Sequence, residues 1–158
     1  KALRISMVLL YYWSMRKINH SNPEFRTGRH CIFNMHVHLV FVTKYRKSVL
    51  KNKHIVSLKT LFSSVCADFE SELIECNGEE DHVHLLITYP PKVSIAKLVN
   101  SLKGVSSRKL KQLHPELNKK YFNGALWTPS YFSASCGGAP LDIIKQYVQS
   151  QRVVNEQS

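Results

Sequence analysis

The chain has 158 residues, of which 44% are hydrophobic and 21% are charged, and these values are ordinary for a soluble globular protein of one domain. Its 22 Lys and Arg residues outnumber 11 Asp and Glu residues, so the net charge is +11 and the pI is about 9.6. Such a charge favours a polyanionic partner, most often nucleic acid, over a basic protein with no such partner.

The N-terminal stretch "ISMVLLYYW" is apolar for nine residues, which is too short to span a bilayer. No small-residue cleavage site follows it, which argues against a signal peptide. We therefore expect residues 1–25 to be an extension outside the core, residues 26–158 to form a single domain, and the protein to be cytoplasmic without a membrane partner. The cysteines match no zinc motif and are interpreted as reduced thiols. They are Cys31, Cys66, Cys76 and Cys136.

Hydrophobic periodicity predicts six core elements and one further helix. In chain order they are a strand at 36–45, a helix at 52–69, a strand at 71–80, a strand from 81 to the stop at Pro90, a helix at 94–114 with Ser94 as N-cap, a strand at 125–136 and a helix at 141–153. This β-α-β-β-α-β order predicts an α+β fold with a ferredoxin-like or RRM-like antiparallel sheet, plus a C-terminal helix. The first and third strands of this topology are central neighbours.

The tetrapeptide "HVHL" occurs twice, once in each of these neighbouring strands. Residues two apart in a strand share a face, so His36 with His38, and His82 with His84, would each project about 7 Å apart. Such a pair can converge on a metal ion, although a purely structural role is the alternative. The second copy follows the acidic "GEED", and a carboxylate can orient a metal-bound histidine through its second nitrogen.

The last predicted helix contains Tyr147 and Gln151, which share a face at i and i+4. A tyrosine hydroxyl is a nucleophile when a polarised electrophile lies beside it, and a glutamine amide oxygen can be a third metal ligand. The alternative places Tyr147 in the core and Gln151 in solvent.

Basic residues cluster in "TKYRK" (43–47) and "KGVSSRKLK" (103–111), at strand and helix positions suited to phosphate contacts. A solvated basic helix face is the alternative. The predicted DNA-binding residues are Lys44, Arg46, Lys103, Ser106, Ser107 and Arg108.

The ordered set "DHVHLL", "KGVSSR", "LWTPSYF" and "GGAPLDIIKQYVQSQ" resembles the single-tyrosine HUH transposases, the TnpA-like enzymes of small bacterial insertion sequences. The resemblance runs from about residue 29 to residue 151. It implies that His82 and His84 are the HUH metal ligands, that Gln151 is the third ligand, and that Tyr147 attacks DNA to form a 5′-phosphotyrosine. In the first HVHL only His38 has a counterpart, so that copy is interpreted as sheet structure.

The resemblance also implies Mg²⁺ or Mn²⁺ as cofactor and single-stranded DNA with hairpins at the element ends as partner. Family members work as homodimers in which a tyrosine helix can complete the partner's active site. Three alternatives remain from the residues: a non-catalytic single-stranded nucleic-acid-binding module, a phosphodiesterase with twin histidine motifs, and a rolling-circle replication initiator. The third position of both HVHL motifs is His rather than Ser or Thr, which argues against the phosphodiesterase.

Overall fold

The computed structural model describes residues 26–120 and 124–135. Two compact units make up the chain, Lys1–Met35 and His36–Ser158. The expected extension at 1–25 and the expected helix at 141–153 lie outside the described residues, so these domain limits stay predictions. No helix in the described part of the chain is long and apolar enough to cross a membrane.

The described part of the first unit is a short hairpin. Strand β1 (Arg26–Thr27) pairs antiparallel with β2 (Ile32–Phe33). The turn is closed by a hydrogen bond of 2.7 Å from the Gly28 amide to the Cys31 carbonyl. The guanidinium of Arg26 lies over the Phe33 ring, 5.3 Å from its centroid. Sequence patterning did not predict this hairpin, because its strands are only two residues long.

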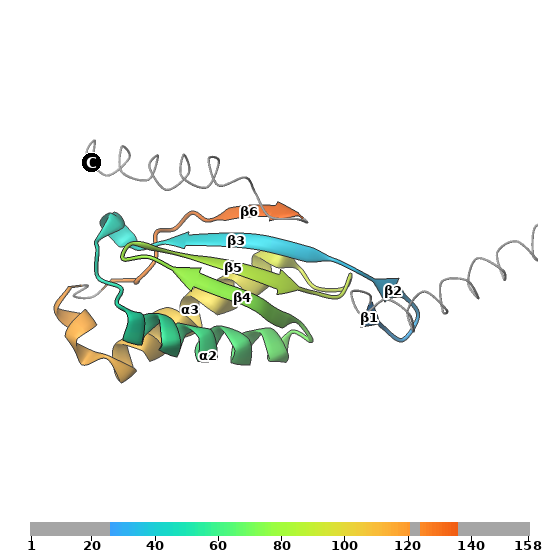
Figure 1. Cartoon of the computed structure of the whole chain (residues 1–158), viewed down its shortest axis with the longest axis horizontal. Helices are drawn as coiled ribbons and strands as arrows, with labels where there is room; N and C mark the ends of the chain where they lie inside the picture. The colour runs from blue at the N-terminus through green and yellow to red at the C-terminus, as the bar shows by residue number, and fades with distance from the viewer. Residues whose placement is uncertain (1–25, 121–123, 136–158) are drawn as a thin grey trace, which may run out of the picture. The chain divides into compact units, whose positions relative to one another are not determined.

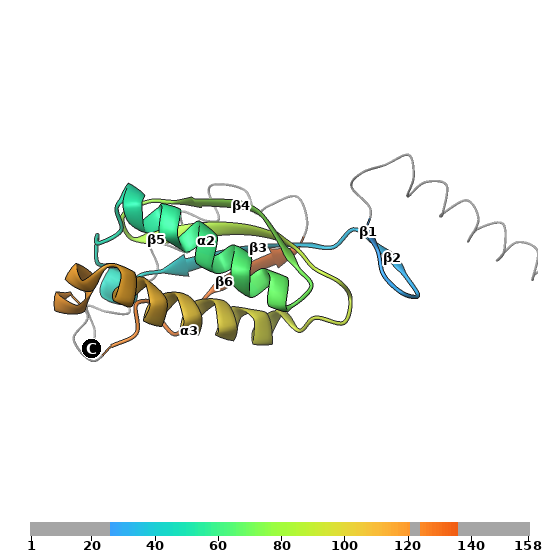
Figure 2. The same cartoon turned by 90° about the horizontal axis from the view of Figure 1, so that it is seen from below.

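The second unit is a four-stranded antiparallel sheet with helices on one face (Figures 1 and 2). Its elements are β3 (His36–Val42), α2 (Asn52–Asp68), β4 (Glu72–Gly78), β5 (His82–Thr88), α3 (Ile95–Leu113) and β6 (Phe132–Ser135). The strand order is β4-β5-β3-β6, and each neighbouring pair is antiparallel. This confirms the ferredoxin-like prediction, including the central position of the first and third core strands.

The core lies between the sheet and the two helices. Alternate residues of β3 and β5 face α2 and α3 and are buried; they are Val37, Leu39, Phe41, Val83, Leu85 and Ile87. Phe41 packs against Phe62 of α2 and against Trp127, with ring centroids 6.0 and 5.8 Å apart. Because strand side chains alternate between faces, the histidines of both strands lie on the opposite face from the helices.

Helix α3 begins as predicted. The Ser94 hydroxyl accepts a hydrogen bond of 3.4 Å from the Lys97 amide, which caps the first turn. Two short 3-10 turns join the main elements: η1 (Lys44–Arg46) follows β3, and η2 (Pro115–Lys119) follows α3.

Two strands are shorter than predicted. Strand β3 ends at Val42, because Tyr45 and Arg46 adopt positive φ values of 60° and 49°, which leave the extended region. Strand β6 begins only at Phe132. The Lys103 ammonium donates hydrogen bonds of 2.5, 3.0 and 3.1 Å to the carbonyls of Thr128, Pro129 and Ser130. These carbonyls therefore point toward α3 and do not pair with a neighbouring strand.

We predict that Ser106→Ala lowers the free energy of unfolding by about 1–3 kcal/mol, because it leaves a buried donor without its partner. The Trp127 indole N–H donates to the Ser106 hydroxyl at 2.8 Å, and both residues are buried. Urea denaturation followed by tryptophan fluorescence measures the change. Ser64→Ala, on the exposed face of α2, is the matched control and should change stability by less than about 0.5 kcal/mol. Equal losses in the two variants would contradict the prediction.

Candidate active site and nucleic-acid interface

His82 and His84 converge on the open face of the sheet. Their Nε2 atoms lie 3.1 Å apart, and their ring centroids are 4.8 Å apart. Two nitrogens that each bind one ion at about 2.1 Å lie about 3.0–3.4 Å apart for ordinary coordination angles. The pair therefore has the spacing of two ligands of one metal ion, without movement of the backbone.

A carboxylate holds the first ring of this pair. Asp81 Oδ1 accepts a hydrogen bond of 2.7 Å from His82 Nδ1, and Asp81 Oδ2 accepts one of 2.8 Å from Arg46 Nε. The hydrogen bond with His82, supported by the contact with Arg46, holds the pKa of Asp81 below its ordinary value against the opposing effect of burial. The site thus contains an ionised carboxylate behind one histidine.

The second ring is surrounded by other imidazoles. Burial lowers the pKa of His84 to about 4, and repulsion from His82 and His38 acts in the same direction. The His38 ring from β3 lies 5.8 Å from the His84 ring, centroid to centroid. Burial also lowers the pKa of His38. A neutral His84 presents a lone pair, which is the form that binds metal.

The segment after β3 fixes this arrangement through the backbone. The Thr43 amide donates to the Asp81 carbonyl at 2.9 Å, and the Thr43 hydroxyl donates to the Lys47 carbonyl at 2.8 Å. The Arg46 amide donates to the Thr43 carbonyl at 2.8 Å, which closes the η1 turn. These hydrogen bonds position Arg46 beside the carboxylate of Asp81.

A second cluster with ligand-like spacing lies at the start of α2. The ligand atoms of His54, His114 and Glu116 lie within 4.8 Å of one another. However, the Lys51 amide donates to His54 Nδ1 at 2.9 Å, so in a neutral ring the proton lies on Nε2, which faces Glu116 Oε1 at 3.2 Å. Metal binding at Nε2 needs that lone pair, so these hydrogen bonds assign the cluster a structural role that joins α2 to η2.

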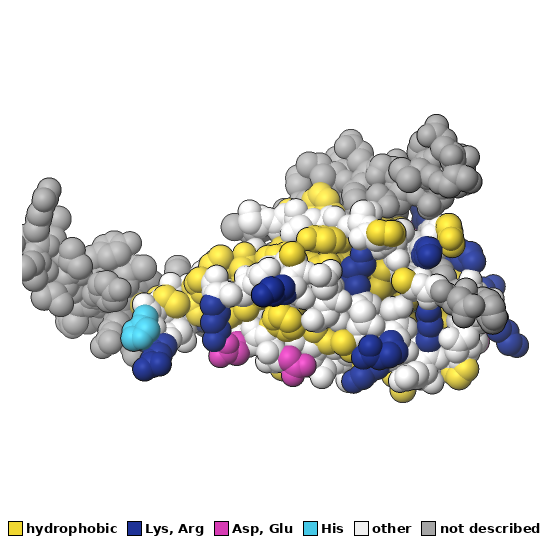
Figure 3. Space-filling view, turned by 180° about the vertical axis from the view of Figure 1, so that it is seen from behind, with side chains coloured by type: hydrophobic (Ala, Val, Ile, Leu, Met, Phe, Trp, Pro, Cys, Tyr) yellow, Lys and Arg dark blue, Asp and Glu magenta, His cyan; other side chains and the backbone are white. Residues whose placement is uncertain are grey.

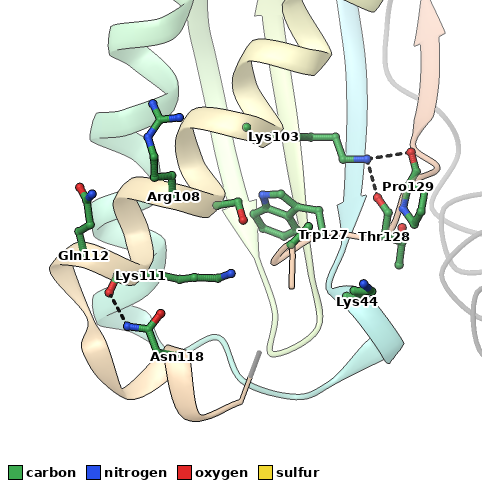
Figure 4. Close-up of a pocket in the computed structure, with 12 residues that line it drawn as sticks. Lys44, Lys103, Arg108, Lys111, Gln112, Asn118, Trp127, Thr128 and Pro129 are labelled. Atoms are coloured by element: carbon green, nitrogen blue, oxygen red, sulfur yellow. Dashed lines mark hydrogen bonds between the residues drawn. The ribbon is translucent and has the colours of Figure 1, made fainter. Parts of the chain in front are cut away.

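A basic pocket of about 610 Å³ lies between α3 and the segment before β6. Four cationic side chains line it, and none of its lining residues is acidic; the cations are Lys44, Lys103, Arg108 and Lys111. Figure 4 shows Lys103 and Lys111 reaching from α3 to either side of Trp127. In Figure 3, Lys and Arg side chains gather at one end of the visible face, and the acidic side chains in view lie away from that end. A pocket with a cationic lining suits a polyanion such as nucleic acid.

Residues 31–151 match the family model described as "Transposase IS200 like". The chain belongs to the IS200-like transposase family. The ISDra2 transposase TnpA of Deinococcus radiodurans is 33% identical over 128 residues, which cover 81% of this chain and 91% of the relative. The transposase for insertion sequence element IS200 of Salmonella typhimurium is 28% identical over 122 residues, which cover 77% of this chain and 80% of that protein.

A solved structure agrees with this family assignment. The crystal structure of a protein assigned as a transposase from Deinococcus radiodurans R1 superposes with a TM-score of 0.73 at 31% identity. The match covers 80% of this chain and 97% of that one. The resemblance recognised from the ordered motifs is therefore confirmed at the level of the family and the fold.

Only some of the residues predicted to bind DNA line the pocket with side chains turned to solvent. Arg108 is exposed and Lys44 is half-buried, with its ammonium 5.4 Å from the Tyr45 ring centroid. The other four residues predicted to bind DNA make contacts within the protein. Arg46 binds Asp81, Lys103 binds three carbonyls, Ser106 binds Trp127, and the Ser107 hydroxyl accepts from the Leu126 amide at 2.9 Å.

Tyr147 and Gln151 lie outside the described residues, so their roles in this transposase stay predictions. Sequence reasoning did not single out Asp81 or Lys111. The acidic lead-in "GEED" pointed to a carboxylate near the pair, but spacing alone does not say which of its residues reaches His82. Lys111 ends the basic run on α3, and its ammonium donates to the Gly124 carbonyl. Burial, together with repulsion from Lys44, lowers the pKa of Lys111.

We predict that His54 makes the transposase less stable in mild acid. Burial lowers the pKa of His54, against the hydrogen bond to Glu116, which raises it. Below about pH 6.5 the unfolded chain binds a proton that the folded chain does not, so the free energy of unfolding falls as the pH drops toward the folded pKa. Urea denaturation between pH 7 and pH 5 should give a smaller decrease for His54→Gln than for the wild type. Identical pH dependence in both proteins would contradict this prediction.

Proposed function

We propose that this transposase cleaves and rejoins single-stranded DNA at the ends of an insertion sequence through a 5′-phosphotyrosine intermediate at Tyr147. The observation that carries the proposal is the convergence of two imidazole Nε2 atoms, 3.1 Å apart, in a chain of the IS200-like transposase family. Insertion-sequence ends as the substrate are supported by the similarity to the ISDra2 and IS200 transposases.

His82, His84 and Gln151 would hold Mg²⁺ or Mn²⁺. The donor set fits a divalent ion. The distance between the two Nε2 atoms suits two ligands of one ion, and the amide oxygen of Gln151 would add a hard donor. Two imidazoles favour Mn²⁺ over Mg²⁺ in affinity, while abundance favours Mg²⁺. The chemistry that such an ion supplies is Lewis-acid polarisation of the scissile phosphate and neutralisation of charge on its oxygens.

The chain's own groups carry out the transfer. The Tyr147 oxygen attacks the scissile phosphorus and loses its proton, and the DNA 3′-oxygen leaves as a hydroxyl. The phosphodiester bond energy is retained in the tyrosine ester. A second DNA 3′-hydroxyl later attacks the same phosphorus and releases Tyr147, which rejoins strands without ATP. No GxxxxGK[ST] phosphate-binding motif occurs in the sequence, consistent with this energy balance.

The basic pocket would bind part of the DNA. Its lining supports contacts to phosphates from Lys44 and Arg108. The family resemblance suggests hairpins at the element ends as the structured partner. It also suggests a homodimer, with the tyrosine helix of one subunit free to complete the site of the other. A DNA substrate of this kind leads us to expect the enzyme in the cytoplasm of its host.

Incubation of the protein with single-stranded oligonucleotides from the flanking DNA, with Mg²⁺ or Mn²⁺, tests the chemistry. We expect a covalent protein–DNA adduct on denaturing gels with the wild type and none with Tyr147→Phe. His82→Ala should also form no adduct, while it retains most DNA binding in a filter-binding assay.

An adduct with Tyr147→Phe would disprove the assignment of the nucleophile. Metal-dependent cleavage by His82→Ala at the wild-type rate would disprove the metal site. Tight binding without any adduct from the wild type would favour the alternative function, a non-catalytic single-stranded nucleic-acid-binding module.

We predict that Arg108→Ala weakens DNA binding and lowers the salt dependence of the affinity. Loss of one phosphate contact should reduce the slope of log K against log salt by about 0.7 for a single strand or about 0.9 for a duplex stem. Lys109→Ala is the matched control, because Lys109 is the exposed neighbour on α3 and does not line the pocket. Titrations by fluorescence anisotropy at several salt concentrations measure both slopes. Equal slopes for the two variants would argue against the pocket as the DNA site.

A further inference from the structure

We propose that Asp81 is the positioning residue for the metal site, and that Arg46 holds it in place. In this role, Asp81 fixes the proton of His82 on Nδ1 and so leaves the His82 Nε2 lone pair directed at the site it shares with His84. The inference rests on the proposed function of the histidine pair as metal ligands. It adds a residue that does not itself touch the metal or the DNA.

The contact with Asp81 determines which nitrogen of the His82 ring carries the proton. A carboxylate accepts hydrogen bonds and donates none, so the contact of 2.7 Å from Asp81 Oδ1 requires the proton on His82 Nδ1. In the neutral ring the other nitrogen then carries a lone pair. That nitrogen, Nε2, is the one that lies 3.1 Å from His84 Nε2. The carboxylate therefore selects the tautomer that can bind a metal.

The carboxylate itself is held in a fixed direction. Its other oxygen, Oδ2, is held by Arg46 Nε at 2.8 Å, and its own backbone carbonyl is held by the Thr43 amide at 2.9 Å. Arg46 reaches Asp81 from a turn in which Tyr45 and Arg46 both have positive φ. Such conformations cost non-glycine residues about 1 kcal/mol or more each, and they persist where surrounding contacts hold them. The turn is thus built to aim Arg46 at the carboxylate.

The two histidines differ in burial and in the groups that surround them. His82 is buried and has a carboxylate behind it, whereas His84 is half-buried and the electrostatic neighbours that act on it are His82 and His38. Within the described ranges, no carboxylate contacts His84. The pair therefore consists of one ring in a set orientation and tautomer, and one ring whose proton can move to Nδ1 when Nε2 takes up an ion.

An asparagine at position 81 makes a sharp test, because it keeps the shape but carries one acceptor and one donor. Arg46 Nε needs an acceptor, so the amide oxygen of Asp81→Asn is drawn to Arg46 and its NH₂ group faces His82 Nδ1. That contact favours the proton on Nε2, the tautomer that lacks the Nε2 lone pair. Replacing Arg46 as well, in Asp81→Asn with Arg46→Ala, frees the amide to rotate its oxygen toward His82 and should restore part of the affinity.

The experiment measures Mn²⁺ affinity of the full chain by isothermal titration calorimetry and histidine tautomers of the metal-free protein by ¹⁵N NMR. We expect Asp81→Asn to weaken Mn²⁺ binding about 10- to 100-fold and to shift the His82 proton from Nδ1 toward Nε2. Glu80→Gln is the matched control, with the same charge change at the preceding residue, whose exposed side chain is not part of these contacts. It should bind Mn²⁺ as the wild type does. Thermal melting shows that each variant is folded.

The outcomes separate this inference from the proposed function. No Mn²⁺ binding by the wild type would overturn the metal site, while the tautomer of His82 would still test the role of Asp81. Wild-type binding with equal affinities for Asp81→Asn and Glu80→Gln would overturn the positioning role and leave the metal site intact. An unchanged His82 tautomer in Asp81→Asn would also overturn it, even if the affinity falls.

Discussion

The register between β3 and β5 is the constraint on which the candidate site depends. Val42 lies opposite His82, Val40 opposite His84, and His38 opposite Leu86. A shift of one residue would turn every side chain of one strand to the other face, placing both histidines of β5 in the core. Burial of the alternate apolar residues under α2 and α3, each worth about 1.5–3 kcal/mol, opposes that shift. The hydrophobic core therefore determines where the imidazoles project.

The basic residues of this transposase divide into internal and external groups. Lys103 lowers the electrostatic cost of three clustered carbonyls, and burial lowers the pKa of its ammonium. Arg46 is occupied by Asp81. Lys44 and Arg108 line the pocket together with Lys103, but Arg108 is exposed and Lys44 is half-buried. Excess positive charge predicts a polyanionic partner, but it does not identify which cations are available to contact that partner.

Much of the fold could be predicted from the sequence. The order of elements, the central pairing of the two HVHL strands and the cap at Ser94 follow from local patterns, which the structure confirms. The early end of β3 and the late start of β6 could not be predicted. The first depends on positive φ values at Tyr45 and Arg46, and the second on contacts from Lys103, a residue about 25 positions away along the chain.

The candidate site also could be predicted only in part from the sequence. Spacing and motif order select His82 and His84, and the structure brings their Nε2 atoms together. The contact of Asp81 with Arg46 joins two segments 35 residues apart, so no local pattern could reveal it. The contact of Asp81 with its neighbour His82 is local, but spacing does not say which acidic residue of the lead-in turns toward the ring. The roles of Tyr147 and Gln151 rest on the family resemblance and on the experiments proposed above.

The η1 turn contributes one side chain to the basic pocket and one to the surroundings of the histidine pair. Its first residue, Lys44, lines the basic pocket, while its last, Arg46, supports the carboxylate behind His82. Only Tyr45 separates a side chain suited to contacting DNA from one that supports the carboxylate behind His82. Because one three-residue turn positions both side chains, a change in its backbone would move the pocket lining and the support of Asp81 together.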